Sequence, residues 1–439
     1  RYSSLMSKSN FFGGLIKTNP TLPTANSGAN YGVASGVWNL EEALAFREAG
    51  DWPIPASAPG APTITGVTGG NAQVAVAFNA NASTGGLDVT SFTALASSGQ
   101  SASGSSSPIT VTGLTNGTAI TFTVTATNAA GTSSASSASS SVTPAAASRA
   151  LFAGGVVSSY LNVIDYVTTA SAGNATDFGD LTQSKSHGGS VASVTRGVFA
   201  GGHTGARQNV IEYVTIASTG NGTDFGDLTQ SRDVCGEASS GTRGVIAGGH
   251  TGSGYTDIID YITIASTGDA TDFGDLIVAR DATGSGASTT RGLFAGGGLG
   301  YFPYASTQID YITIASTGDG ADFGSLSQAN NQLTGASNDT RAFFAGGNEN
   351  GSITDTINYV TIASLGNSSD FGNLVEDRRL ADACASTTRG LIGGGIGSGT
   401  GIDDKIQLIT IGSTGNATDF GDLTANRYQP FSTATYGGV

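Results

Sequence analysis

The sequence is dominated by one unit that occurs six times between residue 149 and the C-terminus. Every copy contains an arginine followed by three residues and then Ala-Gly-Gly or Gly-Gly-Gly, and every copy contains Asp-Phe-Gly at intervals of 47 to 50 residues. A period of this length predicts similar supersecondary units that bury their apolar faces against one another. The repeated charged residues are Arg149, Arg196, Arg243, Arg291, Arg341 and Arg389, with Asp177, Asp224, Asp272, Asp322, Asp370 and Asp419.

Each copy reads as a group of short strands. In the third copy, residues 243–249 form an apolar run that ends at glycines, and residues 257–265 are rich in β-branched side chains. Gly268-Asp269 indicates a tight hairpin before a further strand at 272–276. No stretch of the repeats carries a helical apolar period. Four short strands in about 50 residues predict an all-β, six-bladed β-propeller, with a β-solenoid as the alternative.

The repeat resembles the kelch motif. The resemblance depends on the glycine pair after the second strand, a tyrosine in the third and Phe-x-x-Leu in the fourth. A basic residue often follows that leucine by four positions, as at Lys185, Arg232, Arg280, Arg378 and Arg427. Phenylalanine stands where kelch repeats usually have tryptophan, Asn330 replaces the basic residue once, and Leu408 replaces the last tyrosine. The resemblance implies a propeller over residues 149–439.

The two ends of the repeated region predict how the ring closes. The first copy begins at Arg149 with its second strand, and the tail after Arg427 occupies the position of a first strand. Pairing of this tail with residues 149–183 would remove both open edges. The arginine and aspartate present in all six copies are expected to lock the blades through Arg–Asp or Arg–backbone bonds, because a buried charge must be paired.

Residues 60–144 resemble a fibronectin type III domain. Val74, Val76 and Phe78 alternate as a strand, and residues 109–118 and 122–131 are similar to the last third of that fold. Residues 98–107 are expected to form a loop. Residues 1–59 differ from both regions, with a helix predicted between Asn39 and Gly50. Their apolar side chains exceed what so short a segment buries alone, which predicts docking on a partner through Trp38, Leu40, Leu44, Phe46 and Trp52.

The N-terminal segment also resembles a segment of cyanophage virion proteins. The resemblance depends on Ser-Gly-Val-Trp-x-Leu, a short predicted helix and then Ala-Gly-x-Trp-Pro. It depends also on the amino-acid sequences of residues 213–220 and 416–423 in the repeats. It implies a structural protein on an external appendage or tail of the virion. The expected partners are other virion proteins, held through residues 1–59, and further copies of the chain in a homo-oligomer.

Composition excludes several functions. The net charge of −15 argues against nucleic acid and against anionic membrane surfaces, and no apolar run reaches the length of a membrane span. Cys235 and Cys384 are the only cysteines and cannot build a disulfide framework or a cysteine zinc site. Three histidines offer little for nucleophilic catalysis. We therefore expect no catalytic residue, metal or cofactor. The two acids of the repeated Asp-Phe-Gly-Asp leave a bound calcium ion open as the alternative to a chain without metal.

Differences between the copies point to a binding surface. The loop after the glycine pair changes in every repeat, and all six loops are expected on one face of the ring. The candidate binding residues are His203, His250, Tyr255, Tyr301, Phe302 and Tyr304. Loop aromatics suit stacking on a sugar of the host surface or docking on a host protein, and packing on a neighbouring subunit is equally open. The expected function is therefore a non-enzymatic tail fibre or appendage subunit. A carbohydrate-binding bacterial adhesin is the alternative, and a fragment of a secreted kelch-type enzyme is a third.

Overall fold

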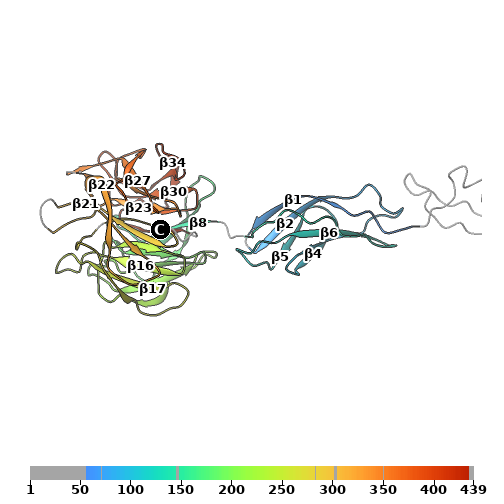
Figure 1. Ribbon diagram of the computed structural model, residues 1–439, viewed down its shortest axis with the longest axis horizontal. Helices are drawn as coiled ribbons and strands as arrows, with labels where there is room; N and C mark the ends of the chain where they lie inside the picture. Colours follow the sequence, from blue (N-terminus) through green and yellow to red (C-terminus); the bar gives the residue numbers. More distant parts are fainter. Residues whose placement is uncertain are drawn as a thin grey trace, which may run out of the picture. The chain divides into compact units, whose positions relative to one another are not determined.

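The computed structural model describes residues 56–70, 72–144, 148–281, 283–300, 304–349 and 351–434. All regular secondary structure in these residues is β-strand, arranged in small antiparallel sheets, so the predicted all-β class is confirmed. The chain divides into two compact units, Arg1–Ala146 and Ala147–Val439 (Figure 1). The predicted N-terminal helix and its apolar residues Trp38, Leu40, Leu44, Phe46 and Trp52 lie outside the described residues.

The described part of the first unit consists of two sheets. One contains β1 (Thr63–Gly70), β2 (Gln73–Asn79) and β5 (Ile109–Thr112). The other contains β4 (Ser101–Gly104), β3 (Ser91–Ala96), β6 (Phe122–Asn128) and β7 (Gly131–Thr132), in that order. Alternate residues of β2 and β6 are buried in a common core, as the period of two requires. The expected loop at 98–107 was wrong in part, because Ser101–Gly104 pairs with β3 as an edge strand.

The second unit contains six sheets of the same construction. The strands of the first three are β35 (Phe431–Ala434), β8 (Arg149–Ala153), β9 (Val163–Thr168) and β10 (Thr176–Asp180); β11 (Gly189–Ala192), β12 (Arg196–Ala200), β13 (Val210–Thr215) and β14 (Thr223–Asp227); and β15 (Gly236–Ser239), β16 (Arg243–Ala247), β17 (Ile258–Thr263) and β18 (Thr271–Asp275). Within each sheet the strands lie in this order and every neighbouring pair is antiparallel.

The other three sheets repeat this order with small additions in their loops. They contain β19 (Gly284–Ala287), β20 (Arg291–Ala295), β21 (Ser306–Thr313) and β22 (Ala321–Asn331), extended by β25 (Asn348–Glu349) and β26 (Ser352–Ile353); β23 (Thr334–Ser337), β24 (Arg341–Ala345), β27 (Thr356–Thr361) and β28 (Ser369–Asn373); and β29 (Asp382–Ala385), β30 (Arg389–Gly393), β33 (Lys405–Thr410) and β34 (Thr418–Asp422). A separate hairpin joins β31 (Ile396–Gly397) to β32 (Gly401–Ile402).

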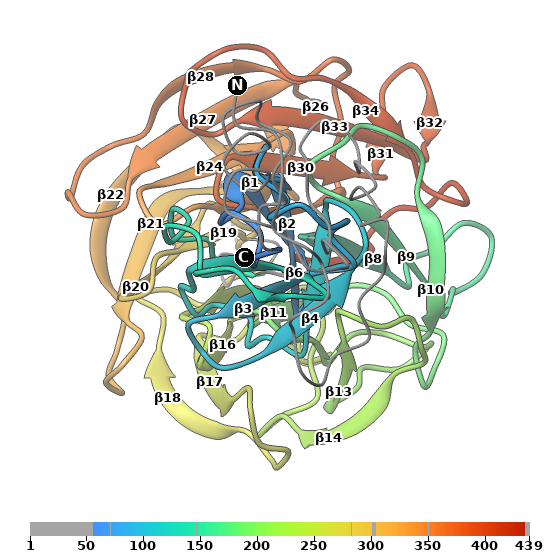
Figure 2. The same ribbon diagram turned by 90° about the vertical axis from the view of Figure 1, so that its right-hand side faces the viewer.

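The first strands of the six sheets contact one another in a closed cycle. The cycle runs β11, β15, β19, β23, β29, β35 and back to β11. In Figure 2 the sheets are arranged around a common centre, and their last strands β10, β14, β18, β22 and β28 lie at the periphery. The last strand, β35, is the edge partner of β8, so the predicted pairing of the C-terminal tail with the first repeat is confirmed. Each apolar core lies between two neighbouring sheets.

Asp-Phe-Gly forms a β-bulge in every sheet. In the third sheet Asp272 pairs with Asp260 and Gly274 with Ile259, which leaves Phe273 as the extra residue. The bulge directs Phe273 into the core, where its ring meets Tyr261 edge-on with the ring centroids 6.0 Å apart. Gly274 has φ +146°, and a Cβ there would lie 2.6 Å from the backbone of Gly318 in the next sheet. Only glycine fits both requirements.

The six repeated arginines bond to backbone. Arg196 Nη1, for example, donates to the carbonyl of Ile264, directly after the third strand of the next sheet, at 2.9 Å. Five of them also lie over a tyrosine of their own sheet, with 4.4 to 4.8 Å from guanidinium carbon to ring centroid. The repeated aspartates lie on the exposed bulge. Of the two predicted contacts between sheets, the structure contains the bond from arginine to a backbone carbonyl. The predicted bond from arginine to these repeated aspartates was wrong. The bonds join Arg149 to Ile216, Arg196 to Ile264, Arg243 to Ile314, Arg291 to Ile362, Arg341 to Ile411 and Arg389 to Thr169.

A second set of basic residues forms buried ion pairs between sheets. Arg232 Nη2 lies 3.0 Å from Asp260 Oδ2, and neither side chain has exposed surface. In the fourth copy Asn330 replaces the arginine, and in the next sheet Asn358 replaces the acid. Both charges are therefore absent at this interface, and the Asn330 side chain donates to the carbonyl of Gly346 instead. The pairs are Lys185–Glu212, Arg232–Asp260, Arg280–Asp310, Arg378–Asp403 and Arg427–Asp165.

The Gly-Asp and Gly-Asn sequences do not form tight hairpins, so that prediction was wrong. They lie in a longer loop between the third and fourth strands, and this loop bonds to the preceding sheet. Gly268 donates its N–H to Phe225, and Asp269 Oδ1 accepts from the N–H of Asp227 at 3.0 Å. The side chain therefore secures two sheets to each other, and a turn preference alone does not explain it.

Candidate functional site

The loops after the glycine pairs are small hairpins that are fixed at their base. His203 bridges to Arg207 across its loop, and His250 bridges to Tyr255 in the next. The first residue of each of these loops also bridges to the preceding repeat, as His250 does with Asp233. These backbone bonds hold the variable side chains on a rigid base, which is the usual construction of a binding surface.

Five residues that precede the first strands form what we call the mouth ring. His187, Val234, Gln332, Leu380 and Gln429 occupy equivalent positions, and all have left-handed φ values between 54° and 64°. Their backbones bond to one another: Leu380 donates to Gln332, Gln429 to Leu380, His187 to Gln429, and Val234 to His187. A left-handed valine is costly, and here the hydrogen bonds between successive repeats oppose that cost.

A hollow of about 280 Å³ lies over the mouth ring. Loops of three successive repeats contribute to its wall, with Arg207 from the second, His250 and Tyr255 from the third, and Leu299 and Tyr304 from the fourth. Its volume is close to the lower end of the range for small-molecule sites. The remaining lining residues are largely polar, and they include Asp233, Asp281, Asn331, Gln332 and Gln429.

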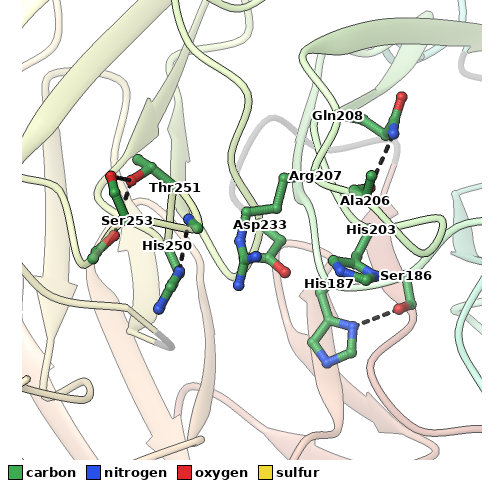
Figure 3. A network of polar contacts seen from close by, with 12 residues as sticks. Ser186, His187, His203, Ala206, Arg207, Gln208, Asp233, His250, Thr251 and Ser253 are labelled. Atoms are coloured by element: carbon green, nitrogen blue, oxygen red, sulfur yellow. Dashed lines mark hydrogen bonds and ion pairs between the residues drawn. The ribbon is translucent and has the colours of Figure 1, made fainter.

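Two carboxyl groups in the hollow have different environments. Arg207 Nε lies 2.9 Å from Asp233 Oδ1, which forms an ion pair at the wall (Figure 3). Burial raises the pKa of Asp281 to about 7, and the negative charge of Asp233 acts in the same direction. The N–H of Gly298 opposes this rise by bonding to the Asp281 carboxyl. Gly298 leaves room for that contact, since a Cβ there would lie 2.4 Å from Asp281 Oδ1.

His250 and Tyr255 form an aromatic corner of the hollow. Their rings meet edge-on with centroids 5.1 Å apart. The N–H of Gly252 donates to His250 Nδ1 at 3.0 Å, so the neutral ring carries its proton on Nε2. Burial, together with the charge of Asp281, raises the pKa of Tyr255. Together these residues provide ring faces and polar edges within one wall.

The serine–histidine contact beside the hollow is unsuited to nucleophilic catalysis. Ser186 Oγ contacts His187 Nδ1, as Figure 3 shows. Ser186 has no exposed surface, and burial lowers the pKa of His187 to about 3, with the positive charges of His203 and Arg207 acting the same way. A base this weak does not take a proton from a hydroxyl near neutral pH, and a buried nucleophile is out of reach of substrate.

The structure brings together half of the predicted binding residues. His250, Tyr255 and Tyr304 line the hollow, whereas His203 does not and instead contacts Tyr160, with 2.7 Å between the hydroxyl and Nδ1. Tyr301 and Phe302 lie outside the described residues.

Sequence reasoning missed Arg207, Asp233, Asp281 and the mouth ring. A signal for the two acids was present, because each follows a buried arginine of the repeat, Arg232 or Arg280. The left-handed backbone of the mouth ring carries no such signal, since its residues share no chemical type.

No protein-family model matches the chain, and no curated protein matches it. Within the residues that the structure describes, no helix is long and apolar enough to cross a membrane. The same residues contain no group of three or more His, Cys, Asp or Glu side chains placed to hold a metal ion.

Proposed function

We propose that the chain is a non-enzymatic structural protein of a phage particle, of the tail-fibre or appendage type. In this proposal the second unit is a six-bladed kelch-like β-propeller, and the first unit contains a fibronectin type III-like sandwich. The closed cycle of first strands and the β35–β8 pairing support the propeller. The division into sheets β1-β2-β5 and β4-β3-β6-β7 supports the sandwich.

The propeller's task in this proposal is to bind a sugar of the host surface in the hollow over the mouth ring. One observation carries it: loops that differ between copies combine aromatic rings with an ion pair and other polar groups around one cavity. Aromatic faces stack on the apolar face of a sugar ring, while carboxylate, amide and guanidinium groups bond its hydroxyls. The remainder of the wall comes from the segments that precede the first strands, namely the mouth ring and neighbours such as Asp233, Asp281 and Asn331.

Tyr255→Ala tests the binding role. Tyr255 and Tyr160 hold equivalent positions in their loops, but only Tyr255 lines the hollow, so Tyr160→Ala is the matched control. We expect Tyr255→Ala to reduce binding to host cells or to immobilised host glycans at least about tenfold, while Tyr160→Ala leaves it unchanged. Replacing Tyr301 and Tyr304 by Ala together should also abolish binding. Equal losses in both single variants would contradict the hollow as the binding site, and dissociation of an oligomer by Tyr255→Ala would assign it to subunit contact.

The location is tested by immunogold electron microscopy of purified virions with antibody against residues 149–439. Gold on a tail or appendage is the expected result, with residues 1–59 providing the attachment. Bare virions, with the protein on bacterial surfaces, would instead support the alternative function of a carbohydrate-binding adhesin.

A further inference from the structure

The charged groups around the hollow over the mouth ring do not balance. Arg207 provides the permanent positive charge among its lining residues, and that guanidinium is already paired with Asp233, with 2.9 Å between Nε and Oδ1. Asp281 lines the same hollow, and within the described residues it takes part in no ion pair. Asp165 and Asp260, which are buried between sheets, each have an arginine partner, so Asp281 differs from them.

The surroundings of Asp281 oppose its negative charge. Burial raises the pKa of its carboxyl to about 7, and the charge of Asp233 adds to the rise. The N–H of Gly298 and the charge of Arg207 act against the rise without cancelling it. A positive charge that a ligand places beside Asp281 would therefore stabilise the ionised carboxylate, which the protein's own residues do only in part.

Two amide oxygens of the same lining also lack a donor. Asn331 and Gln429 both line the hollow, and Asn331 Oδ1 and Gln429 Oε1 are buried without a hydrogen-bond partner in the described part of the chain. The other end of the Asn331 amide is used, because its Nδ2 donates to the carbonyl of Tyr304 at 3.4 Å. A buried acceptor without a donor costs free energy. Together with the Asp281 carboxyl, these oxygens suit a ligand that is rich in N–H and O–H groups.

An aromatic ring lies next to the Asp281 carboxyl. A Cβ on Gly298 would lie 2.4 Å from Asp281 Oδ1 and 3.9 Å from Tyr255 Cε1, so the carboxyl and the ring adjoin the same glycine. His250 meets the Tyr255 ring edge-on, which completes the aromatic corner. A carboxylate beside aromatic rings attracts an ammonium group in two ways, through its charge and through the electron-rich ring faces.

We propose that the sugar bound in this hollow is an amino sugar with a free, positively charged amine, which lies beside the Asp281 carboxylate and the Tyr255 ring. This inference rests on the proposed function, because it takes the hollow as the sugar site and adds the chemical class of the sugar. The hydroxyls of the same sugar donate to the amide oxygens of Asn331 and Gln429. An N-acetylated sugar lacks the charge, and an acidic sugar meets an arginine that Asp233 already occupies.

The test measures binding of the full chain to immobilised sugars of the glucose and galactose series. Each series contains the parent sugar, the free amine, the N-acetylated amine and the uronic acid, at pH 7 and about 0.15 M salt, so that long-range attraction is screened. We expect at least one free amine to bind about tenfold or more tightly than its parent and its N-acetylated form, as a charged hydrogen bond provides. This comparison uses the unaltered protein, so it does not depend on the folding of a variant.

Asp281→Asn assigns the preference to this carboxyl. The change keeps the shape of the side chain and removes its charge, and we expect it to bring the affinity for the free amine close to that for the parent sugar. Asp272→Asn is the matched control, because it removes the same charge from the exposed bulge. The control is needed since a chain with a net charge of −15 attracts any cationic glycan. It should keep the preference of the wild type.

The outcomes separate this inference from the function on which it rests. Neutral or acidic sugars that bind as tightly as the amines, with binding lost in Tyr255→Ala, would overturn the amine and leave the sugar site in place. A preference for the amine that survives in Asp281→Asn, or that Asp272→Asn reduces equally, would reflect overall charge and also overturn the inference. Binding to none of these sugars or to host cells would overturn both.

Discussion

Single residues of the repeat act across sheets more than within them. The arginine at the start of the second strand reaches a carbonyl of the next sheet, and the basic residue after the fourth strand reaches an acid there. The residues of these two sets thus find their partners in a neighbouring copy, which a chain of similar units provides without any special partner. The change to Asn330 and Asn358 at one interface removes both charges together.

The natural asparagine pair predicts the outcome of a double-mutant cycle at Arg232 and Asp260. Asp260→Asn leaves a buried guanidinium without its counter-charge and should lower the free energy of unfolding by about 3–5 kcal/mol. Arg232→Asn combined with Asp260→Asn imitates the pair at Asn330 and Asn358 and should cost clearly less than the single change. Urea unfolding of the wild type, of each single variant (Arg232→Asn and Asp260→Asn) and of the double variant measures the coupling. A double variant as unstable as the sum of the singles would contradict this account.

The buried ring of His187 should make the free energy of unfolding fall in acid. Its pKa is lowered to about 3 in the folded protein from the ordinary 6.5, so the unfolded chain takes up a proton first. The stability contributed by the neutral ring is fully present above pH 6.5 and is lost as the pH falls toward 3. His187→Asn keeps a residue that tolerates the left-handed backbone but cannot titrate. Between pH 7 and pH 4 the wild type should lose more unfolding free energy than this variant, by up to about 3 kcal/mol. Parallel losses would contradict the prediction.

At the scale of elements, Asp-Phe-Gly is a structural device and not a site. The bulge places Phe273 in the core and leaves Asp272 on the surface, while Gly274 lets the neighbouring loop approach. The same need for close approach recurs at the other five copies, where a Cβ would lie 2.3 to 2.5 Å from a glycine carbonyl oxygen of the adjacent loop. This explains why the glycine is present in all six copies.

Gly274→Ala should destabilise the protein by about 2 kcal/mol or more, because it adds a clash with the backbone of Gly318 to the cost of a left-handed alanine. Gly318→Ala is the matched control. Its φ is +152°, and a Cβ there has nothing within 4 Å, so only the conformational cost of about 1 kcal/mol applies. Thermal or urea unfolding distinguishes the two. Equal destabilisation would show that φ, and not the approach of the loops, requires the glycine.

The first unit contains an element that periodicity alone did not reveal. Ser133, Ser136 and Ser139 lie beside β6, and each Oγ accepts a backbone N–H of that strand at 2.9 to 3.0 Å. The backbone N–H of each serine also donates to β6. A spacing of three fits neither a helix nor a regular strand, so periodicity does not mark this serine-rich stretch, although its side chains complete the edge of the sheet.

At the scale of the whole molecule, closure depends on residues 427–434. β35 covers the edge of β8, and Arg427 Nη2 lies 2.8 Å from Asp165 Oδ2, so the last repeat provides both the strand and the counter-charge that the first requires. Because the sheets are joined in a cycle, loss of one strand affects two interfaces, β29 with β35 and β35 with β11.

Truncation after Asn426 should therefore expose the β8 edge and leave Asp165 buried without its partner. We expect the truncated protein to elute as larger assemblies or aggregates than the full chain in size-exclusion chromatography and to unfold at a lower temperature. A synthetic peptide of residues 427–439 should restore the elution volume of the full chain in part, since it supplies the missing strand. A truncated protein with the elution volume and unfolding temperature of the full chain would contradict closure by β35.

The sequence by itself determined the class of the fold, the number of units and the pairing of the tail with the first repeat. These follow from local rules: β-branched runs, glycine stops and a fixed period. It also pointed to His250, Tyr255 and Tyr304, because variation between copies marks loops.

Only the tertiary structure decided which charges pair, what Gly-Asp bonds to, and which polar residues surround the hollow over the mouth ring. Asp233 and Asp281 come from different repeats, and no spacing within one repeat places them together. The mouth ring is the clearest case, because its left-handed residues are held by hydrogen bonds to the next copy and not by their own side chains. A backbone conformation stabilised from outside its own segment leaves no local trace in the sequence.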